Sequence, residues 1–199
     1  MATRVTLGQI KQYALKSKKY LQEDAGKNGI KIYLHWSAGK YESIFSDYHI
    51  NITGSGIVYA TTRDFSETLA HTWRRNSGSI GVSLCCAYNA TSNNLGSYAP
   101  TLTQIDAIAQ VGCILADALE LEIDKKHILT HGEAADNEDG IWMHPMYGPN
   151  TTCERWDLEY LGTKESPCFN PKATDGSRGG DVLRGKMVWY RLNDLSKRI

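Results

Sequence analysis

The sequence of 199 residues has no excess charge of either sign and no long apolar run. Lysine and arginine together number 22, and aspartate and glutamate also number 22, so the chain has no global basic field that would bind nucleic acid or an anionic membrane. No segment approaches the roughly 20 apolar residues that span a bilayer. We therefore expect neither nucleic-acid binding nor stable membrane insertion, and the partner has to be inferred from a site.

The N-terminal residues 1–19 also lack the uninterrupted apolar core of a signal peptide. We therefore expect the chain to be made in the cytoplasm. Any activity outside the cytoplasm would then require another export route.

Cysteine is present in an odd number, five, and never in a C-x-x-C spacing. This pattern argues against a disulfide framework and against a four-cysteine zinc site. Cys85 and Cys86 fall in a predicted strand and Cys113 in a predicted helix, so we expect buried free thiols. Cys153 and Cys168 could pair after export, and the sequence does not decide whether they do.

The chain does contain an alternation of predicted helices and strands. The spacing of apolar residues predicts helices over residues 7–22, 103–120 and 181–195, and strands over 31–35, 48–52, 56–61, 79–86 and 127–132. Capping-box spacing of Thr6 and Gln9 precedes the first helix, and Thr103 opens the second. Residues 132–152 and 162–180 have irregular, loop-like composition. These elements predict one α/β domain over residues 1–199, with a central mixed β-sheet flanked by α-helices and a C-terminal helix.

Two of the six histidines stand at the ends of predicted strands. His35 ends the run IYLHW, and His131 ends the run ILTHG. Strand ends are rigid positions from which two imidazoles can be aimed at one point. A catalytic zinc usually takes three protein ligands and leaves one position for water. Residues 152–161 offer four candidates for the third ligand, and spacing alone does not choose among Cys153, Glu154, Asp157 and Glu159.

Five segments, in this order, resemble the zinc-dependent N-acetylmuramoyl-L-alanine amidases of the type-2 amidase and peptidoglycan-recognition superfamily, phage lysins in particular. The segments are YLHWSAG, DYHINITGSGIVY, AHTWRRNSGSIGVSL, ILTHGEAA and RWDLEYL. The resemblance is strongest over residues 35–161, and residues 162–199 would then form a loop and a helix packed on the domain. Each segment is weak alone, but five in register are specific.

The resemblance implies that His35, His131 and Asp157 hold a catalytic Zn²⁺. It also implies that Arg155, two positions before the third ligand, stabilises negative charge on the reacting carbonyl. The family commonly has lysine at this position. Arginine keeps a permanent charge and forked donors, which suit an oxyanion but not proton transfer. Cys153 is the alternative third ligand, although it precedes the basic residue instead of following it.

The resemblance also implies catalytic and substrate-binding side chains. Tyr48 falls on a tyrosine that would hydrogen-bond the zinc water or the tetrahedral intermediate; ordinary strand packing is its alternative. Ser83 replaces a glutamate of some relatives and cannot act as a base, so Glu133 becomes a candidate catalytic residue while the general base stays open. The AHTWRRN segment resembles a groove wall, which implies substrate binding by His71, Thr72 and Asn76, with a buried structural role as the alternative for His71.

The implied activity is hydrolysis of the amide bond between N-acetylmuramic acid and the L-alanine of the stem peptide, which lyses the bacterial cell wall. Zinc lowers the pKa of a bound water to about 7 and so supplies hydroxide at neutral pH. The alternatives are a non-catalytic peptidoglycan-binding module of the same fold and a zinc peptidase that cuts within the stem peptide. We expect a monomer that meets peptidoglycan after holin-type release, as an endolysin of a bacteriophage does, or after delivery by a secretion system.

Overall fold

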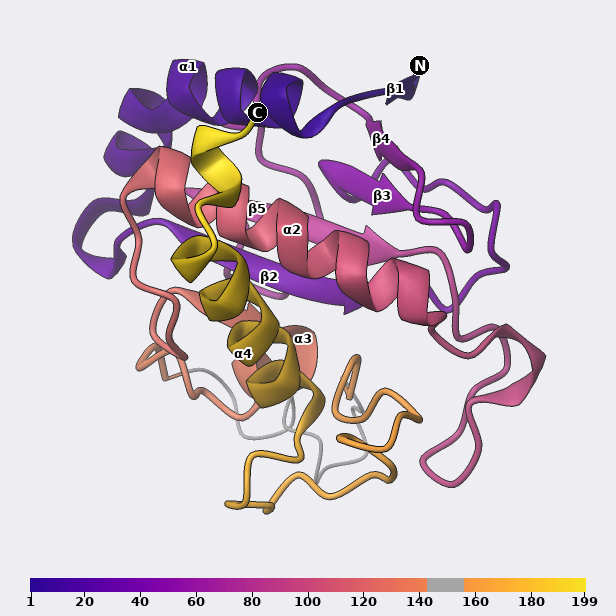
Figure 1. Ribbon diagram of the computed structural model, residues 1–199. Helices are drawn as coiled ribbons and strands as arrows, with labels where there is room; N and C mark the ends of the chain where they lie inside the picture. Colours follow the sequence, from indigo (N-terminus) through magenta and orange to yellow (C-terminus); the bar gives the residue numbers. More distant parts are fainter. Residues whose placement is uncertain (143–155) are drawn as a thin grey trace.

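The computed structural model describes residues 1–142 and 156–199, and its centre is a six-stranded sheet (Figure 1). The strand order is β1-β4-β3-β5-β2-β6. The strands are β1 (Thr3–Arg4), β2 (Lys31–Trp36), β3 (Ile50–Ile52), β4 (Val58–Ala60), β5 (Ser79–Leu84) and β6 (Ile128–Thr130). β3, β5, β2 and β6 are parallel to one another, whereas β4 is antiparallel to both β3 and β1. The predicted α/β class with a mixed sheet is therefore confirmed.

The described α-helices are α1 (Leu7–Ala25), α2 (Leu102–Leu119), α3 (His131–Ala135) and the C-terminal α4 (Gly179–Leu192). Figure 1 shows α2 crossing in front of the sheet, with α1 above it and α4 below it. The short α3 packs on the opposite face, where its Ala134 forms a small apolar cluster with Tyr33 and Leu129. The sheet is thus flanked by helices, as predicted.

The long strands of the sheet have one apolar face and one polar or small-residue face. In β2 and β5 the even-numbered residues join the main core with the helices: Ile32, Leu34, Trp36, Ile80, Val82 and Leu84. The odd-numbered residues point to the other face because side chains alternate along a strand. These residues are Lys31, Tyr33, His35, Ser79, Gly81 and Ser83, and all six are buried. The polar face is therefore covered, and it is the face that carries His35, one of the predicted metal ligands.

Two helices begin with reciprocal caps that satisfy backbone N–H groups at their N-termini. The predicted box of Thr6 and Gln9 precedes α1. The N-cap of α2 is Thr101, paired with Gln104, and not Thr103 as the sequence predicted. Gln104 also donates from its amide to the carbonyls of Ile52 and Cys85, so the helix start is tied to the sheet.

The structure also corrects the predicted boundaries after residue 127. The strand β6 ends at Thr130, and His131 is the first residue of α3 rather than the end of a strand. A third capping box causes this change, because Thr130 accepts from the backbone N–H of Glu133 while the Glu133 carboxylate accepts from the backbone N–H of Thr130. β1 was not predicted, since a two-residue edge strand has no periodic pattern.

The structure shows which cysteines are buried and how deeply the apolar helix α2 is buried. Cys85, Cys86 and Cys113 are buried free thiols, as expected, and Cys168 is an exposed one; Cys153 lies outside the described residues. By length and composition alone, α2 passes a test for crossing a membrane, but 67% of it is buried inside the structure. This is the burial of a core helix.

Candidate metal centre

Two histidines and one aspartate converge at the C-terminal end of the parallel strands. The Nδ1 atoms of His35 and His131 lie 3.1 Å apart. Oδ2 of Asp157 lies 3.2 Å from Nδ1 of His131 and 3.4 Å from Nδ1 of His35. Of the residues that the structure describes, these three form a group that can hold a metal ion.

Each of the three side chains is placed by a different segment. His35 is the fifth residue of β2 and lies on the polar face of the sheet, where it is fully buried. His131 follows the neighbouring parallel strand β6, so the two imidazoles arise at adjacent strand ends. Asp157 lies in a turn, and its own backbone carbonyl accepts a hydrogen bond from the backbone N–H of Gly132, at 3.4 Å. The Asp157 side chain keeps 19% of its surface exposed, which leaves one side of the cluster open.

The three donor atoms fit a tetrahedral cation. Zinc binds histidine nitrogen and carboxylate oxygen at about 2.0–2.2 Å, which places neighbouring donors in a tetrahedron about 3.3 Å apart. The three separations, 3.1, 3.2 and 3.4 Å, surround this value. Two imidazole nitrogens and one carboxylate, with an open fourth side, are the donor set of a catalytic rather than a structural site.

The electrostatics of the cluster favour the ligand forms of His35 and Asp157. Burial lowers the pKa of His35 to about 4, although the hydrogen bond with Asp157 opposes this shift. Burial alone would raise the pKa of Asp157, but the charge and hydrogen bonding of His131 and His35 outweigh it and hold the pKa well below its usual range. At neutral pH His35 is therefore neutral and Asp157 is ionised, and these are the forms that bind a metal.

A groove beside the cluster contains four more of the side chains expected at the site. Tyr48, just before β3, lies with its ring centroid 5.0 Å from that of His35. The groove is lined by Trp36, Ser37, Ala38, Tyr48, Ala70, His71, Thr72, Trp73, Asn76, His131 and Asp157. The structure thus brings Tyr48 and the three predicted substrate-binding residues to the metal ligands, on one continuous surface.

Within this wall, His71, Thr72 and Asn76 have partners inside the protein. The Oδ1 atom of Asn76 accepts from the backbone N–H groups of His71 and Thr72, at 3.2 and 2.8 Å. The Thr72 hydroxyl lies 2.9 Å from Nδ1 of His71 and 3.4 Å from Nε2 of His35. His71 and Thr72 are 5% and 4% exposed, so both present little surface to the groove.

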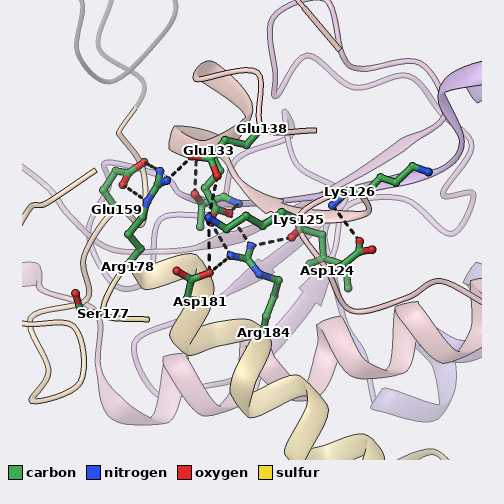
Figure 2. Close-up of polar contacts among 12 residues, drawn as sticks. Asp124, Lys125, Lys126, Glu133, Glu138, Glu159, Ser177, Arg178, Asp181 and Arg184 are labelled. Atoms are coloured by element: carbon green, nitrogen blue, oxygen red, sulfur yellow. Dashed lines mark hydrogen bonds and ion pairs between the residues drawn. The ribbon is translucent and has the colours of Figure 1, made fainter. Parts of the chain in front are cut away.

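Glu133 is not placed to act as a general base, which corrects the prediction. Its two oxygens accept hydrogen bonds from both terminal nitrogens of Arg184 at 2.7 Å (Figure 2). One of these oxygens also accepts from the backbone N–H of Thr130. Burial alone would raise its pKa, but Arg184 outweighs burial and holds the pKa below its usual value. A carboxylate with both oxygens in use is a poor proton acceptor, and its role is structural.

This ion pair belongs to a buried network that joins the segments carrying His131 and Asp157 to α4 (Figure 2). Arg178, the N-cap of α4, forms two hydrogen bonds with Glu159, at 3.0 and 2.7 Å, and also contacts Glu138. Burial raises the pKa of Glu159 to about 7 although Arg178 opposes the shift. A Cβ at Gly132 would lie 2.3 Å from Oε1 of Glu159, so a larger residue there would displace this carboxylate.

A second buried ion pair, which the sequence did not predict, lies beside the groove. The Arg75 side chain contacts both carboxylate oxygens of Asp139, at 2.7 and 3.2 Å, and the Tyr33 hydroxyl donates to the same carboxylate at 2.8 Å. The pair joins the groove loop to the segment that follows α3. The partners lie 64 residues apart, so no local pattern could reveal the contact.

Several predicted roles fall on residues outside the described part of the chain. These are the charge-stabilising role of Arg155 and the alternative ligands Cys153 and Glu154. Ser83 is described and buried in the sheet, where its hydroxyl lies 3.4 Å from the carbonyl of Leu84. No protein-family model, curated protein or solved structure matches this chain, and the site is therefore interpreted from its own geometry.

Proposed function

We propose that the protein is a zinc-dependent amidase that cleaves the bond between N-acetylmuramic acid and L-alanine in bacterial peptidoglycan. The observation that carries the proposal is the convergence of His35, His131 and Asp157 at one side of an open groove. Imidazole nitrogens with a carboxylate suit zinc better than Mg²⁺ or Ca²⁺, because these harder cations prefer an all-oxygen shell. The choice of an amide substrate rests on the five segments that resemble the amidase family.

The side chains around the cluster suit hydrolysis of a poor electrophile. When bound, zinc supplies an activated water at neutral pH and polarises a carbonyl. Tyr48 lies beside His35, where its hydroxyl can donate a hydrogen bond to the oxygen that gains negative charge. We assign the same charge-stabilising role to Arg155. The groove would hold the lactyl group and the first residue of the stem peptide.

The presence of all three ligands favours an enzyme over a binding module of the same fold, which we would expect to lack at least one ligand. A zinc peptidase acting within the stem peptide would use the same ligands. The products separate the two hydrolases: the proposed amidase releases a new N-terminal alanine, whereas a peptidase releases a different amine terminus.

Metal analysis of purified variants tests the site directly. We expect wild-type protein to bind one zinc and to lyse cell walls, and we expect His35→Ala and Asp157→Ala to lose both properties. His127→Ala is the matched control, because this histidine contacts Asp124 on the surface and takes no part in the cluster. Stoichiometric zinc and lysis in both site variants would reject the assignment. Zinc without a new N-terminal alanine would reject the amidase.

A further inference from the structure

A continuous row of hydrogen bonds leads from a backbone carbonyl to the metal ligand His35. The Ser79 hydroxyl donates to the carbonyl of Asn76, at 2.9 Å. Nε2 of His71 lies 3.3 Å from the same Ser79 oxygen, and Nδ1 of His71 lies 2.9 Å from the Thr72 hydroxyl. The Thr72 hydroxyl in turn lies 3.4 Å from Nε2 of His35.

The fixed acceptor at one end determines the direction of every bond in the row. A carbonyl can only accept, so Ser79 uses its one hydroxyl proton on Asn76 and must accept from His71. His71 therefore carries its proton on Nε2. Both ring nitrogens of His71 face hydroxyl groups, those of Ser79 and Thr72, and neither faces a carboxylate that would favour a second ring proton. Nδ1 of His71 is then an acceptor, and the Thr72 hydroxyl donates to it.

The same logic fixes the proton of His35. Because Thr72 donates its hydroxyl proton to His71, its oxygen can only accept from Nε2–H of His35. The lone pair of His35 is thereby left on Nδ1, the atom that faces His131 and Asp157. The row thus delivers an unprotonated nitrogen to the place where the metal would bind.

We propose that Thr72 and His71 are positioning residues that hold His35 in its Nε2–H tautomer, so that Nδ1 is free to bind the metal. The proposal rests on the metal centre proposed above and adds an orienting shell to it. Outer partners of this kind fix the tautomer and ring orientation of metal-binding histidines. It also gives these two buried side chains a role other than contact with substrate.

The surrounding backbone holds the row in place. Asn76 accepts from the backbone N–H groups of His71 and Thr72 and so fixes the turn that carries both side chains. Gly81 lies beneath the His71 ring, and a Cβ at this position would come within 2.6 Å of Cγ of the ring. A side chain at residue 81 would therefore displace the ring from Ser79 and Thr72.

Nitrogen-15 NMR of the histidine rings in metal-free wild-type protein tests the direction of the row. We expect His71 to be protonated on Nε2 with a bare Nδ1. A ring protonated on Nδ1, or on both nitrogens, at neutral pH would overturn the proposal. This readout needs no metal, so it decides the proposal even if the wild-type protein binds no zinc, a result that would reject the metal centre instead.

Two substitutions of Thr72 test the link to the metal. Thr72→Val keeps the shape of the side chain but removes the hydroxyl, and we expect zinc affinity, measured by competition with a chelator, to fall about 10–100-fold. Thr72→Ser restores the hydroxyl and should restore both the affinity and the Nε2–H signature of His35. A valine variant with wild-type affinity, or a serine variant as weak as the valine variant, would overturn the positioning role.

Discussion

At the scale of single residues, the site divides its side chains between those that could hold a metal and those that would meet a substrate. His35 and Asp157 lie within ligand distance of His131. Tyr48 lies beside them, at the groove, with its ring tilted by 47° to that of His35. Tyr48 is therefore a candidate for charge stabilisation rather than for ligation, and these two roles have different experimental signatures.

Replacement of Tyr48 by phenylalanine should lower turnover without removing the metal. We expect kcat for a muropeptide substrate to fall about 10²-fold, because one hydrogen-bond donor to the developing charge is lost. Zinc content should stay at the wild-type level. Unchanged kcat would exclude the phenol from the reaction, and loss of zinc would show that Tyr48 supports the ligands instead.

At the scale of elements, the caps and the C-terminal helix decide where the ligands lie. The capping box of Thr130 and Glu133 begins α3 directly after β6, so that His131 is the first residue of the helix. Arg184 of α4 then holds Glu133, and Arg178 at the start of α4 holds Glu159, two residues after Asp157. The last helix therefore supports both ligand-bearing segments, although it contributes no ligand itself.

Replacement of Thr101 by alanine should destabilise the protein by about 1 kcal/mol, the usual cost of losing an N-cap. Thr103→Ala is the matched control, because Thr103 lies exposed inside the first turn and caps nothing that α2 requires. Urea denaturation of both variants measures the difference. An equal effect of the two substitutions would contradict the assignment of the cap to Thr101.

Replacement of Arg184 by methionine should be much more costly. It leaves the carboxylate of Glu133 buried and without its main partner, and breaking a buried pair in this way costs about 3–5 kcal/mol. The further substitution Glu133→Gln should recover part of this loss in urea denaturation, since it removes the unpaired charge. Lys197→Met, which breaks an exposed pair with Asp194, is the control and should leave stability unchanged.

The sequence predicts the long elements better than the connections between them. The apolar spacing of α1, α2 and β2 identifies these elements within a few residues, because a long periodic run repeats its signal many times. The start of α3 was missed because it depends on one cap. Glu133 became a catalytic candidate because Ser83 left the general base open. Its ion pair with Arg184 spans 51 residues, and nothing near Glu133 in the sequence indicates that partner.

The candidate ligands were also predicted in part from local sequence, and in part could not be. The position of His35 near the end of β2 was predicted from the sequence, whereas His131 follows β6 as the first residue of α3. The adjacency of β2 and β6 in the sheet explains why the two imidazoles meet. Asp157 could be chosen among four candidates only through resemblance. The hydrogen bond between Thr72 and His35 had no signal, since it joins residues 37 positions apart on a loop and a strand.

At the scale of the whole molecule, buried histidines make stability depend on pH. Burial lowers the pKa of His49 to about 4, although the carbonyl of Glu67 opposes the shift. Below the usual value of about 6.5 the unfolded chain takes up a proton that the folded protein refuses, so stability falls as the pH drops from 6.5 to 4. The raised pKa of Glu159 has the opposite effect, because it favours the folded state at lower pH.

Comparison with His49→Gln isolates the contribution of His49 to the pH dependence of stability. Glutamine offers an N–H donor group and an acceptor oxygen but does not titrate. Between pH 7 and pH 4 the wild-type protein should lose about 3 kcal/mol more of its free energy of unfolding than the variant loses. Urea denaturation at a series of pH values gives both curves. Parallel curves would show that His49 does not titrate with the expected shift.

The two unlike faces of the sheet have a consequence for how such a sequence can change over time. Ile32 and Leu34 pack with the helices, whereas Tyr33 and His35, their immediate neighbours, serve the groove side. A substitution that changes the hydrophobic core and one that changes the groove side can therefore fall on adjacent positions of the same strand. A deep mutational scan of β2 should alternate accordingly, with protein abundance falling at Ile32 and Leu34 and zinc occupancy falling first at His35.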